Sequence, residues 1–275
     1  MIFYSDLACE RRRVDLSIDG VNFRKERRGK FLWERIFINS EAGAASIGRP
    51  MGNYDTLTLP AIESLDGEDI YDAAEEISRE LCAICDKKGI LPGRILIAGL
   101  GNGNLTPDSV GPKTAAQINA TMHIKGFSEG LFEELECSEI AVCAPGVSAF
   151  SGMDAAEVIS GICNTIKPDV IFAVDALAAG SPKRLGRTIQ ISDTGIFPGS
   201  GIGNTRAAVD EKRIGVPVIS LGVPTVINAE VYPLGDEDES EGGERLFVSP
   251  KDIDTIVAVS SKIIATGINQ AFGII

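Results

Sequence analysis

Hydrophobic positions change their spacing along the chain, and the change predicts where strands give way to helices. Short, nearly all-apolar runs are typical of strands that are covered on both faces. They span residues 94–100, 140–144, 169–174, 188–192 and 216–221. Apolar residues at helical spacing predict helices over 68–88, 112–122, 154–166 and 251–272. Buried strands that alternate with helices predict an α/β fold, with a mostly parallel sheet and helices on both of its faces.

The first 60 residues follow a different pattern. Val14, Leu16 and Ile18 alternate with polar residues, and Gly20 then supplies a turn. A second strand is expected over residues 31–38. We therefore expect residues 7–60 to form a small β-rich arm of a single α/β domain that spans 7–275. The run at 235–244 is acidic and glycine-rich, which indicates a surface loop.

Composition narrows the class of protein. With 275 residues, 44% hydrophobic and 24% charged, the chain is long enough and apolar enough for one large domain. Its formal charge of −13 repels phosphate backbones, so we expect no direct nucleic-acid partner. No apolar stretch reaches the roughly 18 residues of a membrane span, and no signal peptide opens the sequence, so we expect a cytoplasmic protein. The six cysteines should be reduced thiols, and the single His123 excludes a multi-histidine metal site.

A glycine-rich segment follows the first predicted parallel strand, at residues 99–112. It resembles a dinucleotide-binding fingerprint, but Asn104 stands where the third glycine is needed. The glycines instead allow a sharp turn at the carboxyl end of a strand, where open α/β sheets place their ligands. Asp108 would then face such a site. The alternative is that Asp108 only caps the helix that Pro112 begins.

A second aspartate, Asp175, follows the predicted strand at 169–174 and is itself followed by apolar residues. Burying a carboxylate in such surroundings is costly. Either the carboxylate has a function, or it pairs with a backbone amide or a lysine. Two aspartates at the ends of two parallel strands can converge on one site. A close pair would share one proton, and could activate water for peptide hydrolysis without a histidine, a metal or a nucleophilic serine.

Two short motifs are less specific. Asp193-Thr194-Gly195 matches the motif of pepsin-like aspartic proteases, but those all-β folds need two copies and this α/β chain has one. The glycine-rich run that follows supplies turns or exposed backbone N–H groups, which we expect to line the same site. Cys82 and Cys85 form a CxxC within a predicted helix without a second pair, so we expect them to pack in the core.

Several long motifs, in order, resemble the germination protease (spore protease) family of endospore-forming bacteria. They are GLGNGNLTPDSVGPK at 99–113, APGVSAFSGM at 144–153, VDALAA at 174–179, TIQISDTGIFPGSGIGN at 188–204 and GVPVISLGVPTV at 215–226. The resemblance covers most of the chain.

This resemblance implies an endopeptidase that degrades small acid-soluble spore proteins at germination by an atypical aspartic mechanism. The two essential aspartates of the family match Asp108 and Asp175, whereas Asp193 matches a typical position outside that pair. The implied fold is a three-layer α/β/α sandwich, phosphorylase/hydrolase-like and distantly similar to hydrogenase maturation proteases. It also implies a homotetramer made as a zymogen in the developing spore. From the residues themselves we expect no metal, no other cofactor and no membrane partner.

Ser5-Asp6-Leu7-Ala8-Cys9-Glu10 resembles the acidic-apolar-Ala-x-Glu pattern that the family cleaves. It therefore predicts self-cleavage between Asp6 and Leu7, with residues 1–6 as a propeptide. Polar residues near the predicted strand ends are candidates for orienting a substrate. They are Asn102, Asn104, Ser192, Asp193 and Asn204.

Two alternatives stay open from the sequence. The first is a maturation-type peptidase, similar to the hydrogenase proteases, that clips the tail of a metal-containing partner. The second is a non-catalytic binding or assembly protein that keeps the fold. Asp175→Asn should abolish cleavage under either of the two enzymatic hypotheses.

Overall fold

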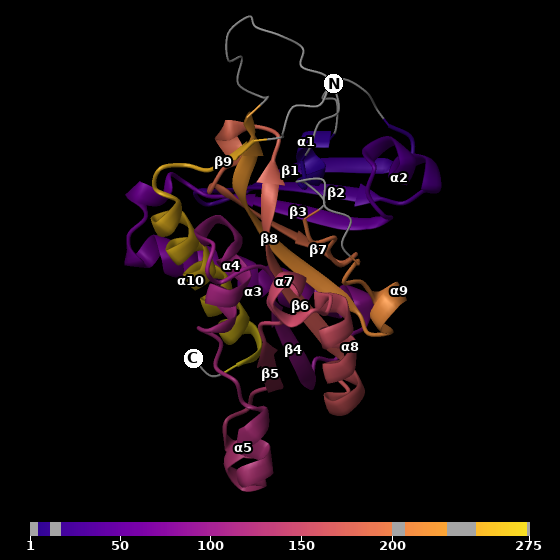
Figure 1. Ribbon diagram of the computed structural model, residues 1–275, viewed down its shortest axis with the longest axis vertical. Coiled ribbons are helices and arrows are strands. Elements are labelled where there is room, and N and C mark those ends of the chain that lie inside the picture. Colours follow the sequence, from indigo (N-terminus) through magenta and orange to yellow (C-terminus); the bar gives the residue numbers. More distant parts are fainter. Residues whose placement is uncertain (1–4, 12–17, 200–206, 230–245, 274–275) are drawn as a thin grey trace, which may run out of the picture.

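A computed structural model describes residues 5–11, 18–199, 207–229 and 246–273 (Figure 1). One nine-stranded sheet runs through it, in the order β1-β2-β3-β7-β8-β6-β4-β5, with β9 paired to β8. The strands are β1 (Val21–Arg28), β2 (Phe31–Ile38), β3 (Gly52–Thr58), β4 (Arg94–Gly99), β5 (Glu139–Cys143), β6 (Val170–Ala179), β7 (Thr188–Ser192), β8 (Val218–Asn228) and β9 (Phe247–Val248).

The sheet has a parallel half and an antiparallel half. Strands β5, β4, β6 and β8 are parallel neighbours, whereas β1, β2, β3 and β7 are joined by antiparallel pairs. The amino-terminal strands extend the main sheet, because β3 pairs with β7 from Tyr54↔Ser192 to Thr58↔Thr188. The predicted parallel arrangement holds for β4, β5, β6 and β8, whereas β7 is antiparallel to both of its neighbours, so the whole sheet is mixed.

Helices cover both faces of this sheet (Figure 1). Helices α3 and α10 pack together on one face, and α8 lies on the other. The helices are α1 (Ala8–Arg11), α2 (Glu41–Ile47), α3 (Gly67–Lys88), α4 (Val110–Ala115), α5 (Met122–Phe127), α6 (Glu129–Glu134), α7 (Ser148–Ser151), α8 (Ala155–Ile166), α9 (Glu211–Ile214) and α10 (Ile253–Phe272), with short 3-10 turns η1 (Ile62–Ser64), η2 (Thr106–Asp108) and η3 (Pro182–Arg184). The predicted α/β class, with helices on both faces of a sheet, is confirmed.

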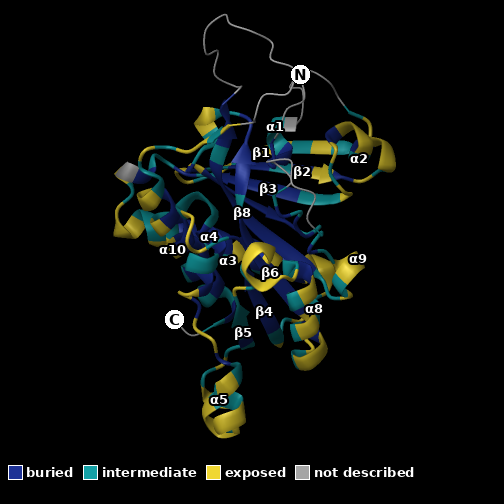
Figure 2. Cartoon of the chain, viewed as in Figure 1, coloured by how far each residue is buried: buried dark blue, intermediate teal, exposed yellow. Residues whose placement is uncertain are grey.

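The alternation of side chains along each strand divides the core between the two faces. Phe172 and Val174 of β6 point toward α3 and α10, where Phe172 stacks on Phe272 with ring centroids 5.1 Å apart. Ala173 and Leu177 point toward α8. Figure 2 shows that the strands in the middle of the sheet are buried along their length, while the outer surfaces of the helices are exposed. Asp175 lies two residues from both Ala173 and Leu177, so it belongs to the same face of the strand, the one covered by α8.

Three predicted elements differ in length from those observed. Strand β6 continues five residues beyond Val174, because β8 pairs with it as far as Ala179↔Ile227. Asp175 therefore lies within a strand and not after one. The helix predicted over 112–122 ends at Ala115, since the chain near Thr121 is tied to β5 by the bond from its amide to the Ile140 carbonyl (3.0 Å). Strand β8 likewise runs beyond its predicted end, to Asn228.

Parts of the prediction fall outside the described residues, namely Val14, Leu16 and the acidic run at 235–244.

Among the described helices, none combines the length and apolar character of a bilayer span. All six cysteines lie in described parts of the chain and are free thiols. Cys85 packs in the core, and burial raises its pKa to about 12, which suits a packing role.

Candidate active site

The chain turns sharply after β4, and the turn places Asp108 against the end of that strand. Gly101 has a φ of +107°, and a Cβ built on it would lie 2.1 Å from the carbonyl oxygen of Asp108. The Asn102 amide donates to Oδ2 of Asp108 (2.9 Å) and to its carbonyl oxygen (3.0 Å). Only glycine fits such a turn, so residue 101 determines where the Asp108 carboxylate is held.

Asp175 occupies the point on β6 where the neighbouring strand ends. Strand β4 pairs with β6 only as far as Gly99↔Val174, whereas β8 continues alongside it. Asp175 is 3% exposed, and its Oδ1 accepts a hydrogen bond from the Ala176 amide (2.9 Å). The backbone partner that the sequence left as an alternative therefore exists.

The segments that carry the two aspartates are in contact. The Leu100 amide donates to the Val174 carbonyl (2.7 Å), and a Cβ on Gly111 would lie 2.4 Å from that same oxygen. From the other side, Oγ1 of Thr225 on β8 donates to the Pro107 carbonyl (2.6 Å). The turn that holds Asp108 is thus attached to both β6 and β8, and the two predicted catalytic residues come from adjoining segments at one end of the parallel half.

The predicted asparagines have different positions. Asn102 holds Asp108 through its backbone amide, and its side-chain oxygen accepts from the Asn104 amide (2.9 Å). This bond closes the loop, and Asn104 is exposed. Asn204 lies outside the described residues.

Ser192 and Asp193 are sequence neighbours on opposite faces of the sheet. The Ser192 hydroxyl is 2.9 Å from Oγ1 of Thr194, on the side of a small pocket between β7, β6 and the amino-terminal segment. The carboxylate of Asp193 points toward α3, where it accepts from the backbone amide (2.8 Å) and side-chain amide (2.6 Å) of Asn53. The structure therefore does not bring Asp193 to the side of the sheet where Ser192 lies.

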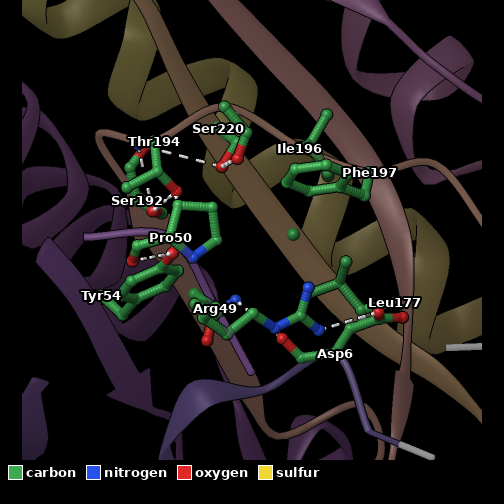
Figure 3. Close-up of a pocket in the computed structure, with 13 residues that line it drawn as sticks. Asp6, Arg49, Pro50, Tyr54, Leu177, Ser192, Thr194, Ile196, Phe197 and Ser220 are labelled. Carbon is green, nitrogen blue, oxygen red and sulfur yellow. Dashed lines mark hydrogen bonds and ion pairs between the residues drawn. The ribbon is translucent and has the colours of Figure 1, made fainter. Parts of the chain in front are cut away.

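The predicted self-cleavage segment contributes Asp6 to the lining of this small pocket. Asp6 is 7% exposed, and its Oδ1 lies 3.1 Å from Nη2 of Arg49. Its Oδ2 accepts from the Ala178 amide (2.9 Å). Figure 3 shows the Arg49 guanidinium pointing toward Asp6, with Leu177 beside it. Leu7 is fully buried.

Sequence reasoning missed Arg49 and Gln190, which hold this segment. Arg49 follows a helix that was not predicted, and nothing near it in the sequence marks it. Gln190 did carry a signal, because it is a polar residue at the centre of the buried strand β7. A buried amide of this kind needs hydrogen-bond partners, and here they are the main chain of Asp6 and Ala8.

The fold and the site together describe an α/β protein with two aspartates on adjoining segments near the carboxyl end of the parallel strand β4. Residues 4–236 match the family model of the germination protease, and the chain therefore belongs to the germination protease family. Membership identifies it as a protease, a hydrolase of peptide bonds, that acts in spore germination.

Two relatives match over nearly their whole length. The chain is 33% identical to the germination protease of Caldanaerobacter subterraneus, over 97% of this chain and 93% of that one. It is 34% identical to the germination protease of Clostridium tetani, over 97% and 94%. Among solved structures, the [NiFe] hydrogenase maturation protease HycI from Thermococcus kodakarensis matches 65% of this chain and 94% of its own, with a TM-score of 0.35 and 18% identity.

Proposed function

We propose that the chain is an endopeptidase that degrades small acid-soluble spore proteins, and that Asp108 and Asp175 activate the water that attacks the peptide bond. The observation that carries this proposal is the bond from the Leu100 amide to the Val174 carbonyl (2.7 Å). It joins the turn that leads to Asp108 to the residue before Asp175. Acids on two adjoining segments can act on the same substrate bond.

In the proposed reaction, the ionised member of the pair takes a proton from water while the water oxygen bonds to the substrate carbonyl carbon. The protonated member donates to the carbonyl oxygen. The C–N bond of the tetrahedral intermediate then breaks as the pair gives its proton to the leaving nitrogen, and one hydroxyl of the intermediate returns a proton to the pair as its C=O bond forms. A carboxylic acid and an amine are released, and the pair again holds one proton. Burial of Asp175 supports its part, because a desolvated acid pair favours sharing a proton.

We also infer that the protein is made as a zymogen that cuts itself between Asp6 and Leu7. Leu7 is fully buried, so another molecule cannot reach this bond while the segment is docked. Self-processing then requires either cleavage within the same chain or release of the segment. We infer a homotetramer in the cytoplasm of the developing spore, on the family resemblance; size-exclusion chromatography with light scattering tests the assembly.

The function is tested by incubating the protein with a purified small acid-soluble spore protein and, in parallel, with a nickel-hydrogenase precursor. We expect the first to be cut at acidic-apolar sites and the second to stay intact. Mass spectrometry of the enzyme itself should find Leu7 as the new amino terminus. An intact spore protein after prolonged incubation would overturn the proposed substrate, and a retained Ser5 would overturn self-processing.

A further inference from the structure

The amino-terminal segment, residues 5–10, lies along a strand edge that β4 leaves open. Beyond Val174, β6 has lost its β4 neighbour, and the amide of Asp6 donates to the Ala178 carbonyl (2.8 Å) on that edge. The Ala178 amide in turn donates to the Asp6 side chain. Peptides that bind to exposed strand edges use main-chain bonds of this kind. Gly222 lines the pocket around Asp6 and is the cross-strand partner of Asp175, so the occupied edge adjoins the candidate active site.

The contacts to the segment's main chain do not depend on its sequence. Oε1 of Gln190 accepts from the Ala8 amide (2.8 Å), and its Nε2 donates to the Asp6 carbonyl (3.3 Å). Gln190 thus holds the peptide units on both sides of Leu7. The side-chain contacts do depend on sequence, since Leu7 packs in the apolar cluster of the α8 face and Ala8 in the cluster that includes Tyr54.

Arg49 pairs its positive charge with the carboxylate of Asp6. Its Nη2 lies 3.1 Å from the Asp6 carboxylate and also donates to the Ser5 carbonyl (3.1 Å). Its Nε is buried and has no hydrogen-bond partner among the described residues. A guanidinium can bind a carboxylate with two parallel N–H donors, so Arg49 retains a donor for a closer pairing. With Asp6 in place, the pocket keeps a cavity of about 20 Å³, which is room for about one water molecule.

We propose that residues 6–8 occupy the chain's own substrate groove, and that Arg49 is the residue that selects an acidic side chain on the amino side of the cleaved bond. This inference rests on the proposed function. Asp6 is then an intramolecular ligand, and release of the segment opens the groove to an acidic-apolar-small sequence in the substrate. Gln190 aligns the main chain of whichever peptide is bound.

The experiment uses two peptides that differ only in Glu or Gln before the cleaved bond. For the processed enzyme we expect kcat/KM to be at least about 10-fold higher for the Glu peptide. Arg49→Gln should bring this ratio close to one, and Arg49→Lys should keep part of it. The matched control is Lys88→Gln, an exposed cation outside the pocket that donates to the Asp193 carbonyl. It should keep the full ratio. Thermal unfolding verifies that each variant is folded.

A binding measurement separates this inference from the proposed function. In the Asp175→Asn background, fluorescence anisotropy should show tighter binding of the Glu peptide than of the Gln peptide. Adding Asp6→Asn should strengthen binding of the Glu peptide further, because the internal ligand then competes less well. If binding shows this preference but wild type cleaves neither peptide, the proposed function is wrong, whereas the inference that Arg49 selects an acidic side chain in this groove is supported. If Arg49→Gln keeps the wild-type preference in either assay, the inference is wrong.

Discussion

Two aspartates, Asp175 within β6 and Asp193 directly after β7, have similar sequence surroundings but different structural surroundings. Both Asp175 and Asp193 come after four or more buried residues. Both oxygens of Asp193 are taken by Asn53 on the antiparallel half. Asp175 lies on the parallel half, where β4 ends and the turn of Asp108 meets β6. The difference indicates that the neighbouring strand, and not the local sequence, determines whether such an aspartate is paired with a structural partner or lies at the candidate active site.

The largest effect should be the difference in activity between Asp175→Asn and Asp193→Asn. Asp175→Asn should lower kcat/KM for a spore-protein peptide by at least about 10³-fold, because it removes one of the two groups that transfer protons in the proposed reaction. Asp193→Asn should stay within about 10-fold of wild type. Steady-state cleavage of one peptide by both variants measures the difference. Equal losses in the two variants would contradict the distinction between the strand ends.

A smaller loss should follow a change in the turn that holds Asp108. Gly101→Ala places a Cβ 2.1 Å from the Asp108 carbonyl at a φ that alanine avoids, so it should lower the free energy of unfolding by about 3 kcal/mol and slow cleavage as well. Gly29 is a matched control, because its φ is also positive (+56°) but no atom lies within 4 Å of an added Cβ. Gly29→Ala should cost about 1 kcal/mol and leave cleavage unchanged. Urea denaturation compares the two.

Asp193 should matter for stability in proportion to the two hydrogen bonds that it accepts. Asp193→Ala leaves the backbone and side-chain amides of Asn53 without this acceptor, and should lower the free energy of unfolding by about 1–3 kcal/mol. Chemical denaturation of the purified variant measures the loss. No change in stability would mean that the Asp193 carboxylate does not stabilise the fold, and it would again be a candidate for orienting a substrate.

The smallest expected effect is a pH dependence on the antiparallel half. Burial, together with the nearby Glu80, raises the pKa of Asp55 to about 7, although Arg35 opposes the shift. Between the unfolded pKa near 4 and this value, the folded state binds more protons, so stability should fall as pH rises from 5 to 7. Over this pH range, the free energy of unfolding of Asp55→Asn should fall by about 1 kcal/mol less than that of wild type.

The control for this pH effect is Asp86→Asn, a change on the exposed side of α3. It should keep the wild-type slope of unfolding free energy against pH. A slope that is the same in the Asp55 variant and in wild type would show that Asp55 does not titrate in this range.

Much of the fold could be predicted from the sequence, because buried strands and amphipathic helices carry clear periodicities. Helix α3 is an example, since its apolar face, its Asp66 cap and its final Gly89 are all local signals. The predicted lengths of β6 and α4 were wrong. Pairing with β8 extends β6, and a hydrogen bond to β5 holds the chain that follows α4, and neither contact is local in the sequence.

The candidate site was predictable in part. The sequence placed Asp108 and Asp175 at the ends of two strands, and the structure brings their segments together. Arg49 was not predictable, because its partner Asp6 lies 43 residues away and no periodic pattern connects them. Asp193 was grouped with the site residues because its orientation depends on Asn53, which belongs to a strand that the sequence analysis did not identify.

The claim that two acids act together is tested most directly by kcat/KM of Asp108→Asn, Asp175→Asn and the double variant on a single peptide. If the two carboxylates work as one unit, each single change abolishes most of the cleavage and the double variant is no slower than either. Wild-type turnover in either single variant would contradict the account.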